Sequence, residues 1–134
     1  MAWHYQQVTG RMIDENGYTW GVGYSGADPG KNKPEFENVH DVGPIPQGGY
    51  SIGAPHDSRE HGPFVLPLIP WKTTELHGRS AFLIHGDSVH APGTASRGCV
   101  IMSRDVRERI WNSRDHSLVV TSGLDEIQRE TRVT

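Results

Sequence analysis

Residues 81–102 read AFLIHGDSVHAPGTASRGCVIM, in which two short apolar runs flank a polar loop. The first run, AFLI, ends at His85, and the second, VIM, begins directly after Cys99. Short apolar runs bounded by Gly, Pro, Ser and Asp are typical of buried β-strands. We therefore expect strands over residues 82–85 and 99–102, with a histidine ending the first strand and a cysteine beginning the second.

The rest of the chain repeats this pattern of short apolar or alternating runs between turn-forming clusters. Further strands are expected over residues 3–8, 18–24, 49–52, 64–69 and 117–121. The sequence DENG at positions 14–17 is typical of a hairpin turn. The connection over residues 26–42 is unusually long, and such loops are often functional. The predicted fold class is mainly β.

One short helix is expected directly after the Cys99 strand. Ser103 can cap its N-terminus, and Asp105 in the first turn interacts favourably with the helix dipole. The apolar face of this helix comprises Val106, Ile110 and Trp111. The charged side chains on the other face are expected to be solvated: Arg104, Arg107 and Glu108.

Length and composition predict a single domain over residues 1–134. The chain has 134 residues, and its 16 Gly and 9 Pro indicate many turns rather than disorder. No internal repeat and no change in composition marks a second domain. The charged tail from Leu124 to Thr134 is expected to be partly frayed.

Several function classes are disfavoured by composition. Acidic residues outnumber Lys and Arg by 16 to 13, so no basic stripe is available for a nucleic-acid partner. The longest apolar run, residues 64–71, contains two prolines and is too short to span a membrane. The first residues show neither a basic segment nor an apolar stretch, so no Sec-type signal peptide is expected. The single cysteine cannot form an internal disulfide, so the fold does not depend on an oxidising compartment.

The polar loop before Cys99 is suited to nucleophilic catalysis. A lone cysteine is more commonly a small buried apolar group, and a histidine in a sheet commonly satisfies only local hydrogen bonds. Here Gly98 lets another group approach the backbone closely, and two successive amides at such a turn can hold an oxyanion. An imidazole brought next to Cys99 would activate a thiol whose ordinary pKa is near about 8.5. The joint placement of His85 and Cys99 therefore favours a catalytic pair.

These segments also resemble a known enzyme family. The sequence IHGD at 84–87 followed by SRGCV at 96–100 resembles the catalytic segment of L,D-transpeptidases, cysteine enzymes that act on peptidoglycan stem peptides. The sequences GYSG at 23–26 and GPIPQGGY at 43–50 resemble the branch of that family found among type VI secretion effectors. The similarity spans residues 21–111.

The resemblance implies a β-sandwich-like catalytic domain with Cys99 as nucleophile and His85 as general base and later acid. It further implies that the Gly86 carbonyl orients the imidazole, that the amides of Gly98 and Cys99 form the oxyanion hole, and that no cofactor is needed. Candidates for the substrate groove, by the same resemblance, are Tyr24, Ser25, Asp87, Ser96 and Arg97. Arg97 stands where many cell-wall members have a second histidine, and this departure fits the effector branch better.

The implied reaction is removal or exchange of the terminal D-alanine of tetrapeptide stems through a thioester on Cys99. Water as acceptor gives L,D-carboxypeptidase activity, a free D-amino acid gives exchange, and another stem gives a cross-link. An effector of this kind would be made in the cytoplasm without a Sec signal and act in the periplasm of a target cell. A cognate immunity protein is an expected partner.

Two other functions are compatible with the residues. A metal-dependent amidase or peptidase could use imidazoles and carboxylates, although their spacing is not a strong zinc signature. The candidate ligands are His56, Asp57, His61, His77, His85, Asp87 and His90. A non-catalytic binding module could stack sugar rings on Trp3, Trp20, Trp71 and Trp111. Of these, Trp20 and Trp111 are expected to be packing anchors.

Overall fold

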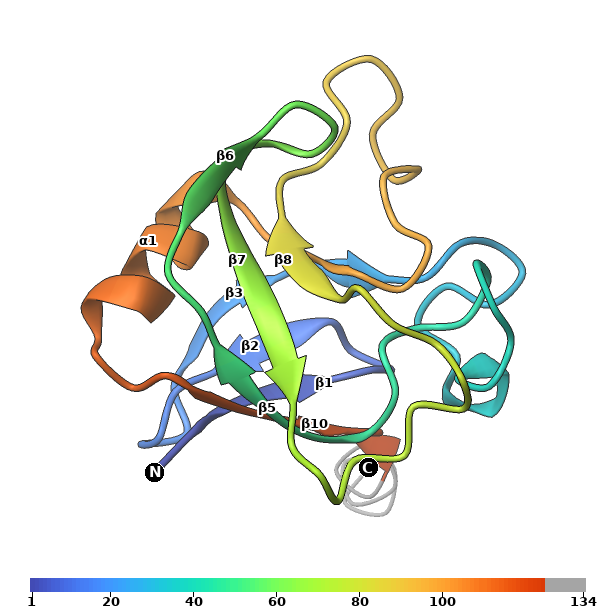
Figure 1. Cartoon of the computed structure of the whole chain (residues 1–134), viewed down its shortest axis with the longest axis horizontal. Helices are drawn as coiled ribbons and strands as arrows, with labels where there is room; N and C mark the ends of the chain where they lie inside the picture. The colour runs from blue at the N-terminus through green and yellow to red at the C-terminus, as the bar shows by residue number, and fades with distance from the viewer. Residues whose placement is uncertain (125–134) are drawn as a thin grey trace, which may run out of the picture.

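The computed structural model describes residues 1–124, in which the strands form one continuous hydrogen-bonded path (Figure 1). The order along the path is β3-β2-β1-β10-β5-β7-β8-β9-β4, and β6 pairs with β7. Two neighbouring pairs, β1 with β10 and β8 with β9, are parallel, and the others are antiparallel. The elements are β1 Trp3–Gln6, β2 Arg11–Ile13, β3 Thr19–Val22, β4 Tyr24–Ser25, η1 Pro34–Phe36, β5 Gly48–Ile52, β6 His56–Ser58, β7 Gly62–Pro70, β8 Leu83–His85, β9 Val100–Ile101, α1 Arg104–Asn112 and β10 Ser117–Thr121.

The predicted mainly β class with one short α-helix is confirmed, and the expected strands appear with small changes in their bounds. The run predicted as one strand over 18–24 is divided, because β3 pairs with β2 whereas β4 crosses to β9. Two strands were not predicted. β2 and β6 have three residues each, too few for an alternating pattern, and β6 has no apolar residue. The DENG turn joins β2 to β3 as expected, with the Gly17 amide donating to the Asp14 carbonyl.

The hydrophobic core gathers side chains from nearly every strand and from the helix. Trp3 is buried in it, and Trp20 and Trp111 pack against it from positions of partial exposure. After Trp3, the largest completely buried apolar side chains are Tyr5, Met12, Ile45, Tyr50, Leu66, Ile84, Ile110 and Leu118. The long connection over residues 26–42 contains the short 3₁₀ helix η1. Most of the charged tail lies outside the described residues.

Helix α1 starts as predicted and lies against β7 and β8. The Ser103 side chain accepts a hydrogen bond from the Val106 amide, the N-cap interaction that serine is favoured for. The prediction that Arg107 is solvated is wrong, because it is 4% exposed and its guanidinium donates to three backbone carbonyls. No helix among residues 1–124 is long and apolar enough to cross a membrane.

Strands β8 and β9 bring the predicted catalytic residues to one face of the sheet. Ile84 pairs with Val100, and His85 pairs with Ile101. Side chains alternate between the two faces of a strand, so Cys99, two positions before Ile101, shares a face with His85. The loop that joins the two strands and the turn between β6 and β7 project from the same end of the molecule (Figure 1).

Candidate active site

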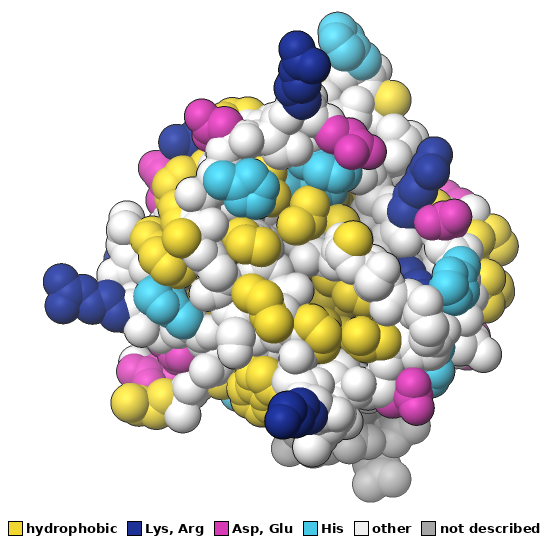
Figure 2. Space-filling view, viewed as in Figure 1, with side chains coloured by type: hydrophobic (Ala, Val, Ile, Leu, Met, Phe, Trp, Pro, Cys, Tyr) yellow, Lys and Arg dark blue, Asp and Glu magenta, His cyan; other side chains and the backbone are white. Residues whose placement is uncertain are grey.

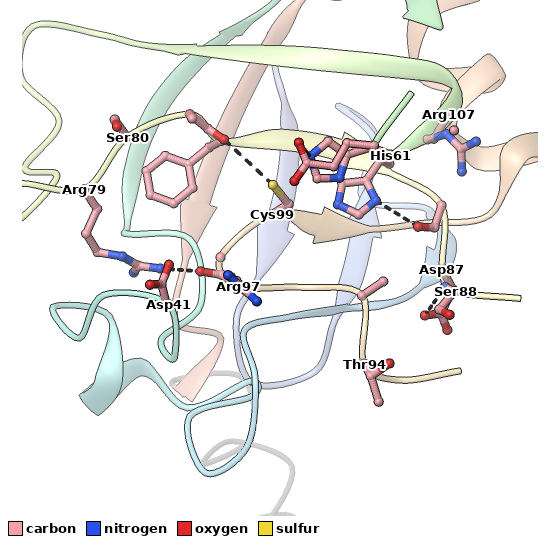
Figure 3. A pocket seen from close by; sticks show the side chains of 18 of the residues that line it. Asp41, His61, Arg79, Ser80, Asp87, Ser88, Thr94, Arg97, Cys99 and Arg107 are labelled. Carbon is pink, nitrogen blue, oxygen red and sulfur yellow. Dashed lines mark hydrogen bonds and ion pairs between the residues drawn. The ribbon is translucent and has the colours of Figure 1, made fainter. Parts of the chain in front are cut away.

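Cys99 and His85 both line a pocket of about 920 Å³ at this end of the sheet. The walls of this cavity, the Cys99 pocket, come mainly from residues 60–63, 78–82, 85–89 and 97–99, together with Arg107. Figure 3 shows Cys99 between Arg79 on one side and His61 on the other. The segments on either side of Cys99 are thus close in space although they are distant in sequence.

The thiol of Cys99 is partly exposed and is held in a protonated state by its surroundings. Its Sγ lies 3.9 Å from the Ala81 carbonyl oxygen, to which a thiol can donate weakly. Burial raises the pKa of Cys99 to about 11, against the smaller opposing effects of the Leu83 amide and the Arg79 charge. A thiol with this pKa needs a proton acceptor before it can act as a nucleophile at neutral pH.

His85 has the tautomer and the free ring nitrogen that a proton acceptor requires. Its Nδ1 lies 2.8 Å from the Gly86 carbonyl oxygen, and because a carbonyl only accepts, Nδ1 carries the proton. Nε2 is buried and has no hydrogen-bond partner among the described residues. Burial lowers the pKa of His85, and the neighbouring His61 and Arg107 lower it further, against the opposing Gly86 bond. The imidazole is therefore neutral near pH 7, with the lone pair of Nε2 available.

His61 belongs to the same site, and sequence reasoning considered it only as a metal ligand. Its ring packs on that of His85, with centroids 4.4 Å apart and planes inclined by 34°. It lies in the turn between β6 and β7, and it lines the Cys99 pocket. No motif in the sequence marks this contact, because it depends on the pairing of the unpredicted strand β6.

Arg107 connects the start of β7, next to the turn that carries His61, to the residue that follows β9. Its Nε donates to the Phe64 carbonyl at 2.9 Å, and its Nη2 donates to the Pro63 carbonyl at 3.2 Å. Its Nη1 donates to the Met102 carbonyl at 2.5 Å. Met102 in turn donates its amide to the His85 carbonyl at 3.0 Å. The arginine on the helix thus connects the segments that hold both imidazoles.

Ser96 organises the turn before Cys99. Its hydroxyl donates to the Cys99 carbonyl at 2.6 Å and accepts from the amides of Gly26 at 2.8 Å and Gly98 at 3.1 Å. Of the two amides predicted to form an oxyanion hole, that of Gly98 is therefore engaged by Ser96. It can serve an oxyanion only if this hydrogen bond is given up.

Ser25 links the same turn to the loop before β5. It is completely buried, its hydroxyl donates to the Gly98 carbonyl at 3.0 Å, and it accepts from the Ile45 amide at 2.8 Å. Neither Ser25 nor Ser96 lines the Cys99 pocket, whereas Arg97 does and is exposed. The two serines therefore hold the backbone rather than present their hydroxyls to the cavity.

Tyr24 and Asp87 hold the loop between β8 and β9. The Tyr24 hydroxyl donates to Asp87 Oδ1 at 2.6 Å and accepts from the Ala95 amide at 2.9 Å. The Gly93 amide also donates to the Asp87 carboxylate. Asp87 lines the Cys99 pocket and Tyr24 does not, so the pair shapes one wall of the cavity through a single exposed carboxylate.

Arg79 is a second buried arginine that sequence reasoning missed. Its Nη1 donates to the carbonyls of Glu37 at 2.6 Å and Pro44 at 2.8 Å. Its Nη2 donates to the carbonyls of Gly43 at 2.9 Å and Arg97 at 3.1 Å. The guanidinium thus joins the long loop before β5 to the turn before Cys99, and it places a positive charge at the pocket wall (Figure 3).

The candidate metal ligands do not come together as a group of three in the structure, whereas one of the four tryptophans stays exposed. Among residues 1–124, no three His, Cys, Asp or Glu side chains are grouped so that they could hold a metal ion. Of the four tryptophans, Trp3 is buried and Trp20 and Trp111 pack against the core, as was expected of the last two. Trp71 is 41% exposed and remains available for contact.

Comparison with known protein families identifies a domain family over most of the chain. A family model described as the Tlde1 domain matches residues 21–123. The matched region contains all four segments that carry the resemblance, residues 23–26, 43–50, 84–87 and 96–100. No curated protein and no solved structure gives a significant match.

Proposed function

The chain belongs to the Tlde1 domain family, type VI secretion effectors with peptidoglycan-modifying activity, and from this premise we propose that it is a cysteine L,D-carboxypeptidase and L,D-transpeptidase. The proposed substrate is a tetrapeptide stem, whose terminal D-alanine is removed by water or exchanged for another D-amino acid. Cys99 is the proposed nucleophile and His85 the proposed general base.

The observation that carries this proposal is the state of His85 beside Cys99. The Gly86 carbonyl fixes the proton on Nδ1, and Nε2 is left buried and without a partner among the described residues. Both residues line one pocket and lie on one face of paired strands. A neutral imidazole with a free Nε2 and a protonated thiol that line one pocket are the two groups that general-base activation of a nucleophile requires.

The reaction would proceed in two halves. Cys99 Sγ attacks the carbonyl carbon at the L-centre of the diamino acid while His85 Nε2 takes the thiol proton. The tetrahedral intermediate collapses when Nε2 returns that proton to the departing nitrogen, which releases D-alanine and leaves a thioester on Cys99. In the second half, His85 removes a proton from water or from the amine of a free D-amino acid, which attacks the thioester and regenerates the thiol.

Stabilisation of the oxyanion is assigned to the backbone at the Gly98–Cys99 turn. The Cys99 amide is one proposed donor, and the Gly98 amide is the second once it leaves the Ser96 hydroxyl. The buried guanidinium of Arg79 supplies positive charge at the same wall. The exposed Arg97 is the proposed partner for a carboxylate of the stem peptide, which a guanidinium recognises in a bidentate manner.

The proposed biological effect is depletion of substrate in the periplasm of a target cell. Stems that lose their terminal D-alanine become tripeptides, and exchanged stems end in a different residue, so fewer D-alanine-ended tetrapeptides remain as donors for L,D-cross-linking. A cognate immunity protein is the proposed partner in the producing cell, and it would protect by closing the Cys99 pocket.

Mass spectrometry of tetrapeptide muropeptides tests the reaction. Wild type and Cys99→Ala are incubated with substrate, with and without a chelator, and with a free D-amino acid present. We expect loss or exchange of the terminal D-alanine by the wild type in both conditions and none by Cys99→Ala. Cleavage that persists without Cys99 and stops with chelator would assign a metallopeptidase instead. No turnover by the wild type in any condition would refute the proposal.

A further inference from the structure

Trp71 lies with one ring face against the sheet and the other toward solvent. A Cβ placed on Gly49 would lie 1.9 Å from Trp71 Cε3 and 2.3 and 2.4 Å from the two atoms bonded to it, the geometry of a point directly above the ring face. The ring therefore rests flat on the backbone of Gly49. Its Nε1 donates to Ser51 Oγ at 3.2 Å, and its amide donates to the Gly49 carbonyl at 3.0 Å. The residue remains 41% exposed, which leaves a fixed aromatic surface open.

Trp71 ends an apolar stripe on the outer face of the sheet. Ile69, two residues earlier, is 53% exposed and pairs with Ser51, and Pro67 is half-buried. Because residues two apart share a face of a strand, these three side chains of β7 and its end form one surface, the Trp71 stripe. Figure 2 shows hydrophobic side chains gathered on the face that carries β7 and β8. Apolar patches of this kind on a soluble domain mark binding sites.

The stripe is continuous with the Cys99 pocket. Pro67 pairs with Leu83, and Leu83 is half-buried on the same face. Ala81, two residues before β8, is exposed and lines the pocket, and its carbonyl accepts from the Cys99 thiol. A molecule that reaches from the pocket along the sheet would therefore pass directly onto the Trp71 stripe.

The distance along this path can be derived from the strand register. Leu66, Ile84 and Val100 form one row across β7, β8 and β9. Cys99 lies one residue before Val100 of this row, and Trp71 lies five residues after Leu66 of the same row. Because β7 runs opposite to β9, both offsets point in the same direction along the sheet. Four residues along a strand and two strand spacings give about 14 Å and about 10 Å, or about 17 Å in all.

This separation fits the architecture of a peptidoglycan stem. The attacked carbonyl belongs to the third stem residue, and three extended residues cover about 10–11 Å, to which the lactyl link to the sugar adds about 3–4 Å. With the carbonyl at Cys99, the first sugar ring would thus reach the vicinity of Trp71. The apolar face of a sugar ring stacks on an exposed tryptophan, and Ser51 and Lys72 beside it offer hydrogen bonds to hydroxyl and acetamido groups.

We propose that the Trp71 stripe binds the glycan strand of the peptidoglycan whose stem peptide enters the Cys99 pocket. This inference rests on the proposed function for the direction of the stem, and it assigns the saccharide part of the substrate to a second surface. The enzyme would then favour stems attached to glycan over free peptides.

The test compares two substrates that differ only in the sugar. Trp71→Ala should raise KM for a disaccharide-tetrapeptide about five- to tenfold, the loss expected for one aromatic stacking contact, and leave KM for the free tetrapeptide unchanged. Trp71→Phe should retain most of the affinity for the disaccharide-tetrapeptide. Val22→Ala, which shortens an exposed apolar side chain on β3, serves as the matched control and should change neither value. If Trp71→Ala changes KM relative to the wild type by the same factor for both substrates, the inference is overturned.

A binding measurement separates this inference from the proposed reaction. Cys99→Ala with and without Trp71→Ala is sedimented with glycan strands from which all stem peptides have been removed, and thermal melting confirms that each variant is folded. We expect the protein with Trp71 to sediment and the double variant to stay in solution. Equal sedimentation of the two proteins would refute the glycan surface, whereas failure of the wild type to turn over any stem would refute the proposed function alone.

Discussion

The imidazole of His61 packs on that of His85 with the ring centroids 4.4 Å apart. The proposed base is therefore covered on one side by a second imidazole. Protonation of His61 places a like charge beside His85. Arg107 adds a further positive charge and Asp87 an opposing negative one. The pKa of His85 therefore depends on a residue from a different hairpin.

Replacement of His61 should shift the acid limb of the pH profile. Burial, then His61 and Arg107, hold the pKa of His85 below its ordinary value of 6.5, so kcat/KM of the wild type should rise with pH below about 6.5. His61→Phe keeps the stacked ring and removes the charge, which moves this limb to higher pH. His61→Ala also admits water and should move it further. A limb that stays in place in both variants would contradict the assigned coupling.

Alkylation of Cys99 should report a protonated thiol. Since burial raises the pKa of Cys99 to about 11, the rate with iodoacetamide should increase about tenfold per pH unit between pH 7 and 9.5 without a plateau. Free cysteine, measured in parallel, should level off above its pKa of about 8.5. A plateau for the protein near pH 7 would instead reveal a standing thiolate–imidazolium pair, which the proposed first step does not contain.

Loss of Arg107 should destabilise the protein much more than loss of a neighbouring arginine. Arg107→Met leaves the carbonyls of Pro63, Phe64 and Met102 without their donor, at a cost of about 3 kcal/mol in the free energy of unfolding. Arg104→Met on the same helix removes a half-exposed ion pair with Glu108 and should cost less than about 1 kcal/mol. Urea denaturation measures both values, and similar costs for the two variants would refute the buried role.

A side chain at position 98 should disrupt the turn before Cys99. Gly98 has φ +140°, and a Cβ there would lie 2.5 Å from Arg79 Nη2. Gly98→Ala should therefore cost about 2–3 kcal/mol of stability and lower kcat/KM more than about tenfold. Gly17→Ala, at φ +85° with no atom within 4 Å, should cost about 1 kcal/mol and leave kcat/KM unchanged. Equal losses of activity in the two variants would show that the turn itself is not critical.

The sequence was sufficient to predict the strands around His85 and Cys99, because short apolar runs next to polar loops have a clear signature. The N-cap of α1 was predictable for the same local reason, since Ser103 bonds within its own helix. The contacts that complete the site are not local. His61 reaches His85 through the polar strand β6, and Arg107 is buried because carbonyls more than 40 residues away need a donor. Helical periodicity describes only which way Arg107 points, and it contains no information on those carbonyls.

The predicted oxyanion hole shows that the sequence also leaves some contacts between near neighbours undetermined. A Gly-Cys turn with two consecutive amides is visible in the sequence, but the direction of each amide depends on its hydrogen-bond partner. Ser96 lies two residues before Gly98, and its hydroxyl takes the Gly98 amide. The serine was expected at the substrate groove, whereas the structure places it within the turn.

The parallel pairing of β8 with β9 has a consequence for how such enzymes diversify. The spacing between the proposed base and the proposed nucleophile is set by ladder hydrogen bonds within the sheet, whereas the connecting loop carries Val89 at 89% exposure. Insertions, deletions and substitutions at that tip leave the ladder intact. Natural selection can therefore remodel the rim of the cavity, and with it recognition of rival cell walls or escape from an inhibitor, while the reacting groups keep their places.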